Sequence, residues 1–353
     1  MEARETVMEP RAAMSHAPAA AAGRINGKRI TLVLLGIVVS VFFGWLATRK
    51  ISLDEVRRSL TDAHYGWVIP SLVLTFVGGW LRAIRWKLLF RDPERVTVTE
   101  SFGALSIGLM FNNLLPSRAG EVPRLFALRR TTGLSAFEIG TTIITERILD
   151  VFVLALAAVA LLPLFPNRGW IHLLGVICAG IVAGCVLLAV LVAVFRQRLR
   201  SVLLWGLRKL PFLGEERARS IVEGVSAGGR ILMRPRRLAV TLALTALAWG
   251  AVGLSGWVLF PAFDLHPGAA APWLILVANS FALTIPSSSA AVGLYEASVQ
   301  ASLVAFGVSH STALSYALVL HAINFFPIIL VGIAASWLMS RSAPHPRLRS
   351  SPT

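Results

Sequence analysis

The sequence predicts an all-α polytopic membrane protein, and two observations support that prediction. The chain of 353 residues is 56% hydrophobic but only 15% charged, whereas soluble domains carry roughly a quarter charged residues. In addition, six apolar runs are each about long enough for a helix to cross a hydrocarbon core of ~30 Å. The expected full transmembrane helices are Ile30–Thr48, Tyr65–Leu81, Ile148–Leu164, Ile171–Phe195, Leu238–Phe260 and Leu314–Met339.

The charge balance indicates what the protein contacts. The formal net charge is +16, from 34 Lys and Arg against 18 Asp and Glu. In a soluble protein this excess of positive charge would indicate binding to nucleic acid. Here the basic residues gather beside the apolar runs, as in cytoplasmic loops. We therefore expect membrane lipid with an anionic headgroup as the partner, and no nucleic acid. Cys178 and Cys185 have neither metal-ligand nor disulfide spacing, so no metal and no cofactor is expected.

The most basic segment, residues 196–237, sets the expected orientation. The positive-inside rule places it in the cytoplasm, together with both chain termini, of a multi-pass protein in the inner (plasma) membrane. Its mixed apolar and basic residues predict an amphipathic helix on the cytoplasmic leaflet, with a solvated loop as the alternative. Residues 1–29 are expected to form a disordered basic tail, and residues 340–353 a second cytoplasmic tail.

One connection departs from this rule. It places basic residues on the predicted outer side, namely Arg49, Lys50, Arg57 and Arg58. Acidic residues near them, such as Asp54 and Glu55, offset the charge but count little in the rule.

Two apolar segments are too short to span the membrane. Ser101–Leu115 and Trp273–Ile285 end at Pro-Ser pairs, which begin at Pro116 and Pro286. Unpaired backbone groups in hydrocarbon cost several kcal/mol each, so such a break must be surrounded by protein or by a watery cavity. We therefore predict two re-entrant helical hairpins.

The order of the predicted elements repeats. Two spans, a hairpin and a third span occur at about 30–164 and again at about 171–339, within a single membrane domain of residues 30–339. Because each half crosses the membrane three times, the second half must be inverted relative to the first. This 3+3 inverted repeat is typical of transporters, whose binding sites lie at the interrupted segments.

The residues after the first break are typical of anion binding. Arg118, Glu121 and Arg124 are spaced i, i+3, i+6 and share one helix face. Arg binds phosphate through two parallel hydrogen bonds. Pro116 would break the helix, and Gly120 would let another backbone approach closely. The alternative interpretation is that these charges only hold the hairpin together, because charges within a membrane must pair whatever their use.

Glu146, Arg147 and Asp150 lie around the start of the third predicted span. A charge at the membrane centre costs at least ~2.5 kcal/mol, so we expect the two carboxylates to face the protein interior. They would pair with Arg118 or Arg124, or carry a proton. Alternatively, they lie near the cytoplasmic end, where water reaches them.

Other polar residues lie beside the second span, at the second break and in the last span. Arg82 and Arg85 are expected to be anchors whose long side chains reach the membrane surface. Three serines at the second break, Ser287, Ser288 and Ser289, precede Glu296 and would hydrogen-bond a headgroup or satisfy a freed backbone carbonyl. His321 and Asn324 lie i, i+3 in the last span, and the histidine is expected to be packed and hydrogen-bonded rather than to relay protons.

Three motifs resemble one family. They are N-x-x-P-S-R-x-G-E-x-x-R from Asn113, E-R-x-x-D from Glu146, and P-S-x5-G-x-x-E from Pro286. They are similar to those of flippase-like integral membrane proteins, which include the membrane region of lysylphosphatidylglycerol synthases. The resemblance runs from about Ile30 to Met339, although Ala290 and Ala291 stand where family members often have Gly. It implies a two-hairpin fold that translocates lipid, and it does not imply lysine transfer.

We therefore expect a flippase or scramblase that moves an anionic phospholipid or a lipid-linked headgroup between leaflets. A polyprenyl-phosphate-dependent glycosyltransferase is the alternative, although the predicted outward loops have few carboxylates and no D-x-D pair. A gradient-driven solute transporter is a third reading, and no Walker A motif is present. No catalytic residue is assigned. The candidate substrate-binding residues are Asn113, Pro116, Arg118, Gly120, Glu121, Arg124, Glu146, Arg147, Asp150, Ser287, Glu296 and Asn324.

Overall fold

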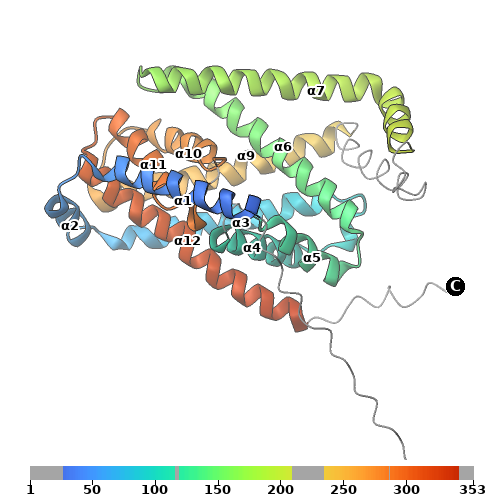
Figure 1. Ribbon diagram of the computed structural model, residues 1–353, viewed down its shortest axis with the longest axis horizontal. Helices are drawn as coiled ribbons and strands as arrows, with labels where there is room; N and C mark the ends of the chain where they lie inside the picture. Colours follow the sequence, from blue (N-terminus) through green and yellow to red (C-terminus); the bar gives the residue numbers. More distant parts are fainter. Residues whose placement is uncertain (1–26, 116–118, 209–233, 286, 342–353) are drawn as a thin grey trace, which may run out of the picture.

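The computed structural model describes residues 27–115, 119–208, 234–285 and 287–341. Every regular element in these ranges is a helix, as Figure 1 shows, which confirms the all-α prediction. The long helices are α1 (Gly27–Thr48), α3 (Val68–Leu89), α6 (Ala136–Leu161), α7 (Gly169–Arg208), α9 (Pro235–Val258) and α12 (His310–Arg341). The short ones are α2 (Leu53–Thr61), α4 (Val98–Leu114), α5 (Glu121–Thr132), α10 (Ala271–Ala282) and α11 (Leu294–Ala305).

Short 3-10 turns connect several of these helices. They are η1 (Tyr65–Trp67), η2 (Pro93–Arg95), η4 (Leu162–Leu164), η6 (Phe260–Phe263) and η7 (Ser289–Ala291).

Five helices within the described ranges are long and apolar enough to cross a membrane. They are Tyr65–Leu89, Ala136–Leu164, Gly169–Leu191, Pro235–Phe263 and His310–Arg341. A sixth crossing follows if Gly36–Thr48 is counted with α2, to which it is bent by 85°. The protein is therefore a multi-pass membrane protein, and these segments overlap the six predicted spans.

Several helices extend beyond the apolar runs that predicted them. The second span was predicted to end at Leu81, but α3 continues to Leu89. The third was predicted to begin at Ile148, but α6 begins at Ala136. Both extensions carry charged residues that pair inside the protein, so hydropathy underestimates the length of these helices. Helix α7 likewise continues to Arg208, into the predicted loop of residues 196–237, whose part at 209–233 lies outside the described residues.

The two predicted tails are slightly shorter than expected. Helix α1 begins at Gly27, so the last residues of the tail predicted at 1–29 are helical. Helix α12 includes Arg341, which was placed in the tail of residues 340–353. The remainder of both tails lies outside the described residues.

Local sequence explains where the helices around the site begin and end. Thr97 and Glu100 form a capping box at the start of α4, in which each side chain satisfies a free backbone N–H of the first turn. The hydroxyl of Ser135 accepts a hydrogen bond from the Glu138 amide at 3.1 Å and begins α6. Gly133, with φ of 68°, ends α5 in the left-handed conformation that glycine adopts readily.

Two helix pairs, α4–α5 and α10–α11, are the broken segments. The helices of each pair pack against each other. The guanidinium of Arg130 donates to the backbone oxygen of Ser340 at 2.8 Å, which places the end of α5 beside the end of α12. In contrast, Leu274 of α10 packs with Phe165 and Ile171, which follow α6. Since α5 leads directly into the start of α6, the two pairs lie toward opposite ends of that helix.

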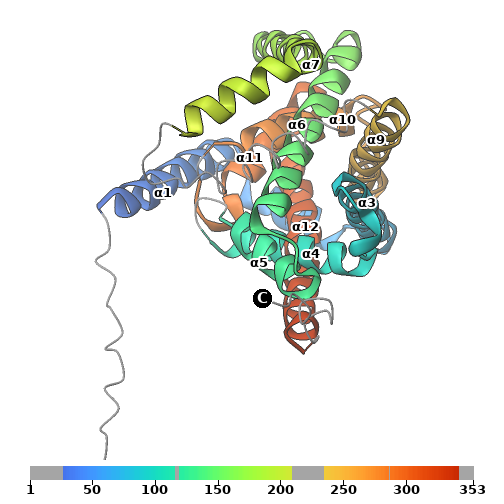
Figure 2. The same ribbon diagram turned by 90° about the vertical axis from the view of Figure 1, so that its right-hand side faces the viewer.

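The core is divided between these two ends. One cluster, which includes Tyr316 and Leu259, joins α9, α10, α11 and α12. The other, which includes Trp86 and Leu128, joins α3, α4, α5, α6 and the last part of α12. Between them η7 contacts α4, so the second break reaches the first broken pair. Figure 2 shows α3 and α9 side by side at one flank of the bundle.

Candidate functional site

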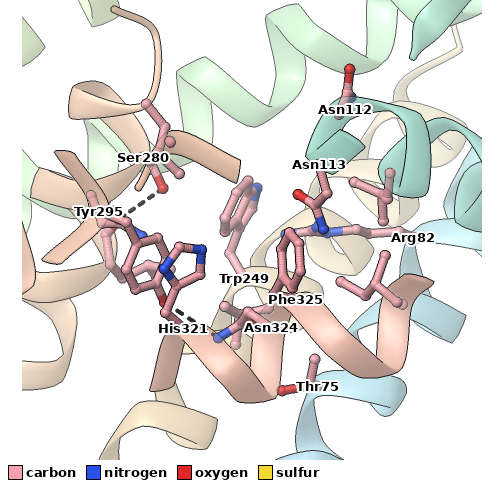
Figure 3. Close-up of a pocket in the computed structure, with 18 of the residues that line it drawn as sticks. Thr75, Arg82, Asn112, Asn113, Trp249, Ser280, Tyr295, His321, Asn324 and Phe325 are labelled. Carbon is pink, nitrogen blue, oxygen red and sulfur yellow. Dashed lines mark hydrogen bonds between the residues drawn. The ribbon is translucent and has the colours of Figure 1, made fainter. Parts of the chain in front are cut away.

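A cavity of about 520 Å³ lies where the two broken segments meet. Its walls come from α3, α4, α6, α9, α10, α12 and the second break, with Glu121 of α5 and Tyr295 of α11. Sites for small molecules and cofactors are typically about 300–1,000 Å³, so the space is large enough for a ligand. Figure 3 shows Arg82, Asn112 and Asn113 at one side of it, and Tyr295, His321 and Asn324 at the other.

Arg82 lines the cavity and pairs with no carboxylate among the described residues. Its guanidinium carbon lies 4.3 Å from the centroid of the Trp249 ring, a cation–π contact. Its Nε atom is buried without a hydrogen-bond partner among the described residues. Asp150 attracts it electrostatically, but no carboxylate in the described ranges lies within ion-pair distance. The expectation that Arg82 reaches the membrane surface is therefore wrong, because its side chain lines the cavity.

Arg85, one helical turn later, is fully buried and paired. Its guanidinium lies 2.9 Å from Glu146 and also pairs with Asp150. A further hydrogen bond of 3.2 Å reaches the hydroxyl of Thr245. The indole N–H of Trp249 donates to the same Asp150 carboxylate at 3.0 Å. Arg85 was also expected to be a surface anchor. This expectation is wrong, because the carboxylates that pair with Arg85 lie inside the bundle.

Arg124 extends this ion-pair network into α5. It pairs with Glu146 and lies 3.5 Å from Glu121. Its guanidinium carbon is 3.7 Å from the centroid of the Trp86 ring. Glu121 pairs in turn with Arg147, whose side chain is 50% exposed. The network thus runs from fully buried groups to a partly exposed end.

The charges of this network do not cancel. Four arginines (82, 85, 124 and 147) stand with three carboxylates (Glu121, Glu146 and Asp150) among the described residues. One positive charge is left over, and Arg82 is the arginine without a paired carboxylate. Because the membrane interior screens charge poorly, an anion that entered the cavity would be attracted to this side.

Gly120 allows the two helices of the first broken pair, α4 and α5, to pack closely together. The amide of Gly120 donates to the Asn112 side-chain oxygen at 2.8 Å. A Cβ on Gly120 would lie 2.0 Å from the backbone oxygen of Gly108. The expected close approach of another backbone at Gly120 is therefore present, and it fixes Arg124 against α4.

The opposite wall contains an aromatic pair, and a hydrogen bond between a histidine and a glutamate lies behind it. The rings of Tyr295 and His321 are stacked, with centroids 4.2 Å apart and an interplanar angle of 16°. The Nδ1 atom of His321 lies 2.6 Å from Glu296, whose other carboxylate oxygen accepts from the Gly293 amide at 2.7 Å. Asn324 donates to the hydroxyl of Tyr295 at 3.4 Å. As expected, His321 is packed and hydrogen-bonded.

Comparison with known proteins identifies the family. Residues 33–332 match the family described as "Lysylphosphatidylglycerol synthase TM region". The chain belongs to this family. A UPF0104 membrane protein of Methanothermobacter thermautotrophicus is 28% identical over 289 residues, which are 75% of this chain and 82% of that protein. Another UPF0104 membrane protein, from Pyrococcus horikoshii, is 22% identical over 330 residues, or 87% of this chain and 96% of that protein.

A third relative carries a different name. The glycosyltransferase AglD of Haloferax volcanii is 28% identical over 161 residues. The match covers 45% of this chain but only 26% of that protein.

The predicted site residues of this family member divide into three groups. Those that line the cavity are Asn113, Glu121, Arg147, Asp150 and Asn324. Those that lie behind its walls are Gly120, Arg124, Glu146, Ser287 and Glu296. Pro116 and Arg118 lie outside the described residues.

At the second break two of the predicted serines lie in different surroundings. The backbone of Ser287 is packed against α1, where a Cβ on Gly36 would lie 2.9 Å from its carbonyl oxygen. Ser288 lines the cavity instead, and its hydroxyl and amide both bond to the Ser40 hydroxyl. The chain reverses direction in this break, and this reversal decides which serine faces the cavity. The amino-acid sequence alone does not show which one it is.

Sequence reasoning missed Arg82, Trp249 and Tyr295 as cavity residues. One indication was available for Arg82. Lys87, near the end of α3, and Arg91, just after it, are better placed to reach the membrane surface. An arginine that far inside a span is expected to face protein or water.

Proposed function

We propose that this protein moves lipids with anionic headgroups between leaflets, with the headgroup passing through the central cavity. The observation that supports this is Arg82, an arginine in the cavity wall with no paired carboxylate among the described residues. A phosphate group cannot cross hydrocarbon alone, because burying an unpaired charge costs far more than binding usually returns. A guanidinium fork at mid-depth would compensate that charge and bind the phosphate through two hydrogen bonds.

The ion-pair network supports the same role. Arg85, Glu146 and Asp150 hold each other and, through Trp249, the ring on which Arg82 rests. Arg82 is thus positioned before a ligand arrives, so less ordering cost accompanies binding. The side-chain amides of Asn112 and Asn113 offer further hydrogen-bonding groups at the same side of the cavity.

The arrangement of the broken pairs also fits transport. Their location toward opposite ends of α6, with the second break against α4, is what two re-entrant hairpins in an inverted repeat would produce. Transporters bind their substrates at such interrupted helices. The sequence has no Walker A fingerprint, so we propose that movement is passive or driven by a gradient.

The test is translocation of headgroup-labelled phosphatidylglycerol in proteoliposomes. Arg82→Gln removes the charge but keeps a polar side chain, and we expect it to slow translocation about tenfold or more, the effect of losing a charged hydrogen bond of roughly 1.5–3 kcal/mol. Arg129→Gln removes an exposed charge near the end of α5 and should leave the rate unchanged.

Folding is checked for each variant by thermal unfolding in detergent. If Arg82→Gln folds and moves lipid at the wild-type rate, the cavity does not carry an anionic headgroup past Arg82 and the proposal fails. Arg118 remains a sequence-based candidate for the same role, and Arg118→Lys should slow translocation because a point charge replaces a planar fork.

The match to glycosyltransferase AglD supports one alternative, transfer of a sugar from a polyprenyl phosphate. It is weaker because the matched segment is 26% of that protein. Incubating the purified chain with a radiolabelled polyprenyl-phosphate sugar and an acceptor separates the two. Sugar transfer without lipid translocation would favour the enzyme, and the reverse would favour the transporter.

A further inference from the structure

A second cavity, of about 410 Å³, lies away from the central one. It is formed by the end of α1, the start of α7 and one face of α11. Tyr295 of α11 faces the central cavity, whereas Ala297, Ala301 and Val304 of the same helix line the second. Residues two, six and nine positions after Tyr295 fall on the far side of a helix, so α11 separates the two spaces.

One end of this second cavity is basic. Arg49 and Lys50, at the end of α1, and Arg168, before α7, all line it, and His310 at the start of α12 joins them. None of its lining residues is a carboxylate. Within the described ranges these three cations have no ion pair, and Arg49 contacts only the ring of Trp45, at 5.5 Å. The cluster therefore offers three permanent positive charges to an occupant.

The other part of the cavity is apolar and firmly held. Its floor is the small-residue face of α11, at Ala297, Ala301 and Ala305. The buried side-chain amide of Gln300 fixes this face by donating to the backbone oxygens of Ala47 at 3.0 Å and His310 at 2.9 Å. A floor of alanines leaves room for a hydrocarbon chain to lie along the helix.

The sequence itself marks this cluster as unusual. Arg49, Lys50 and Arg168 lie on the side of the membrane that the rest of the chain predicts to be outer, where the positive-inside rule disfavours basic residues. Here they converge on one cavity beside Trp170, a residue type that gathers at the membrane surface.

We propose that this cavity binds an anionic glycerophospholipid of the adjoining leaflet. The phosphate lies among Arg49, Lys50 and Arg168, and an acyl chain lies on the alanine face of α11. The charge of the cluster matches an anionic headgroup, and the apolar floor matches a lipid rather than a free anion. This site stands on its own contacts, so it holds whether or not the central cavity transports lipid.

The test is native mass spectrometry of the full chain titrated with phosphatidylglycerol. All variants carry Arg82→Gln, which removes the charged group proposed to bind headgroups in the central cavity. We expect Lys50→Gln with Arg168→Gln to weaken phosphatidylglycerol binding about tenfold or more, given roughly 1 kcal/mol for each basic residue near a headgroup. Ala301→Trp fills the floor without a change in charge and should also weaken it.

A matched control removes the same charge outside the cavity. Arg57→Gln with Arg58→Gln alters the neighbouring helix α2, and binding should stay at the parent level. If this control weakens binding as much as the cavity variants, general surface charge explains the result and the proposal fails. It also fails if the cavity variants bind normally, or if inorganic phosphate at equal concentration displaces the lipid. Loss of translocation in Arg82→Gln without loss at this site would leave both proposals intact.

Discussion

At the scale of single residues, Glu146 holds two buried arginines at once. Its two carboxylate oxygens pair with Arg85 and Arg124, and all three side chains are almost completely buried. Replacement by Gln would leave two charged groups without their shared partner. Removing one member of a buried ion pair typically destabilises a protein by about 3–5 kcal/mol. We therefore expect Glu146→Gln to lower the unfolding free energy by about that amount.

Unfolding in mixed detergent with increasing dodecyl sulfate would measure this change. Glu138→Gln is the matched control, because Glu138 lies in the first turn of the same helix and makes no ion pair among the described residues. It should cost less than about 1 kcal/mol, the usual size of a helix-end charge effect. An equally small effect of Glu146→Gln would mean that the arginines find other partners.

A second residue-scale feature is strain at the second break. Ala290 has φ of 61° and Ala291 has φ of 55°, in the left-handed region. For a residue with a Cβ this conformation costs roughly 1–2 kcal/mol. This is why glycine is the natural residue here, as the family resemblance suggested.

Ala290→Gly should therefore raise the unfolding free energy by about 1 kcal/mol, since it relieves this strain. The same substitution within α10, Ala278→Gly, should lower it by about as much, because glycine is unfavourable inside a helix. Thermal unfolding of the two variants in one detergent would compare them. Two changes of the same sign would contradict the left-handed assignment.

The orientation of a charged side chain was predictable where the charge interrupts an apolar run. Glu146 and Asp150 were expected to face inward because water is absent around them, and their pairing follows from that. Arg82 and Arg85 were misplaced because the apolar run was predicted to end at Leu81, which put both at the expected membrane surface, whereas α3 continues to Leu89. The partners that hold them, Asp150 and Trp249, lie on other helices and are not visible in the local sequence.

At the scale of elements, the closeness of α4 and α5 depends on Gly120. Its φ of −67° suits any residue, so only the contact forbids a side chain. A Cβ would lie 2.0 Å from the Gly108 oxygen and 2.7 Å from the Asn112 amide oxygen. Gly120→Ala must push α5 away from α4, and overpacking of this kind costs about 1–3 kcal/mol. We expect reduced stability together with slower lipid translocation.

Gly140→Ala is the matched control for that variant. A Cβ there would meet only Leu125, at 3.9 Å, and alanine is better than glycine within a helix by up to about 1 kcal/mol. The control should be neutral or stabilising in the same unfolding measurement. If Gly120→Ala behaves like it, the contact between α4 and α5 is looser than the structure shows.

The breaks themselves were predictable, because Pro-Ser after a short apolar segment ends a helix. The extents of α3, α6 and α7 were not, because their charged turns are satisfied by partners distant in sequence or lie outside the apolar run. The packing of the second break against α1 was also hidden, since it depends on close contacts at glycines. A Cβ on Gly293 would lie 2.4 Å from the Ser40 oxygen, so the second break rests directly on that helix.

At the scale of the whole molecule, neither half of the chain encloses its own core. The cluster around Trp86 is completed by Ala335 and Met339 of α12. The cluster around Tyr316 is joined by Leu72 of α3. Each half thus buries apolar surface of the other, which places the cavity and its charged wall at their junction.

This arrangement leads to a prediction about orientation. The end of α5 lies beside the end of α12, whereas α10 lies against the residues after α6. If the two halves are inverted repeats, the connection between α3 and α4 must be cytoplasmic, and the connection between α9 and α10 must be external.

Glu94 and Ala269 are exposed residues of these two connections. In a chain without Cys178 and Cys185, we expect Glu94→Cys to react with an impermeant maleimide only from the cytoplasmic side. Ala269→Cys should react only from outside, and so should Arg57→Cys in α2. The three labels make the test sensitive to the fold rather than to one loop, because α3 lies between Arg57 and Glu94, and α6, α7 and α9 lie between Glu94 and Ala269. Labelling of Glu94→Cys and Ala269→Cys from the same side would rule out the inverted repeat, and with it the idea that a headgroup meets Arg82 midway between two oppositely entering hairpins.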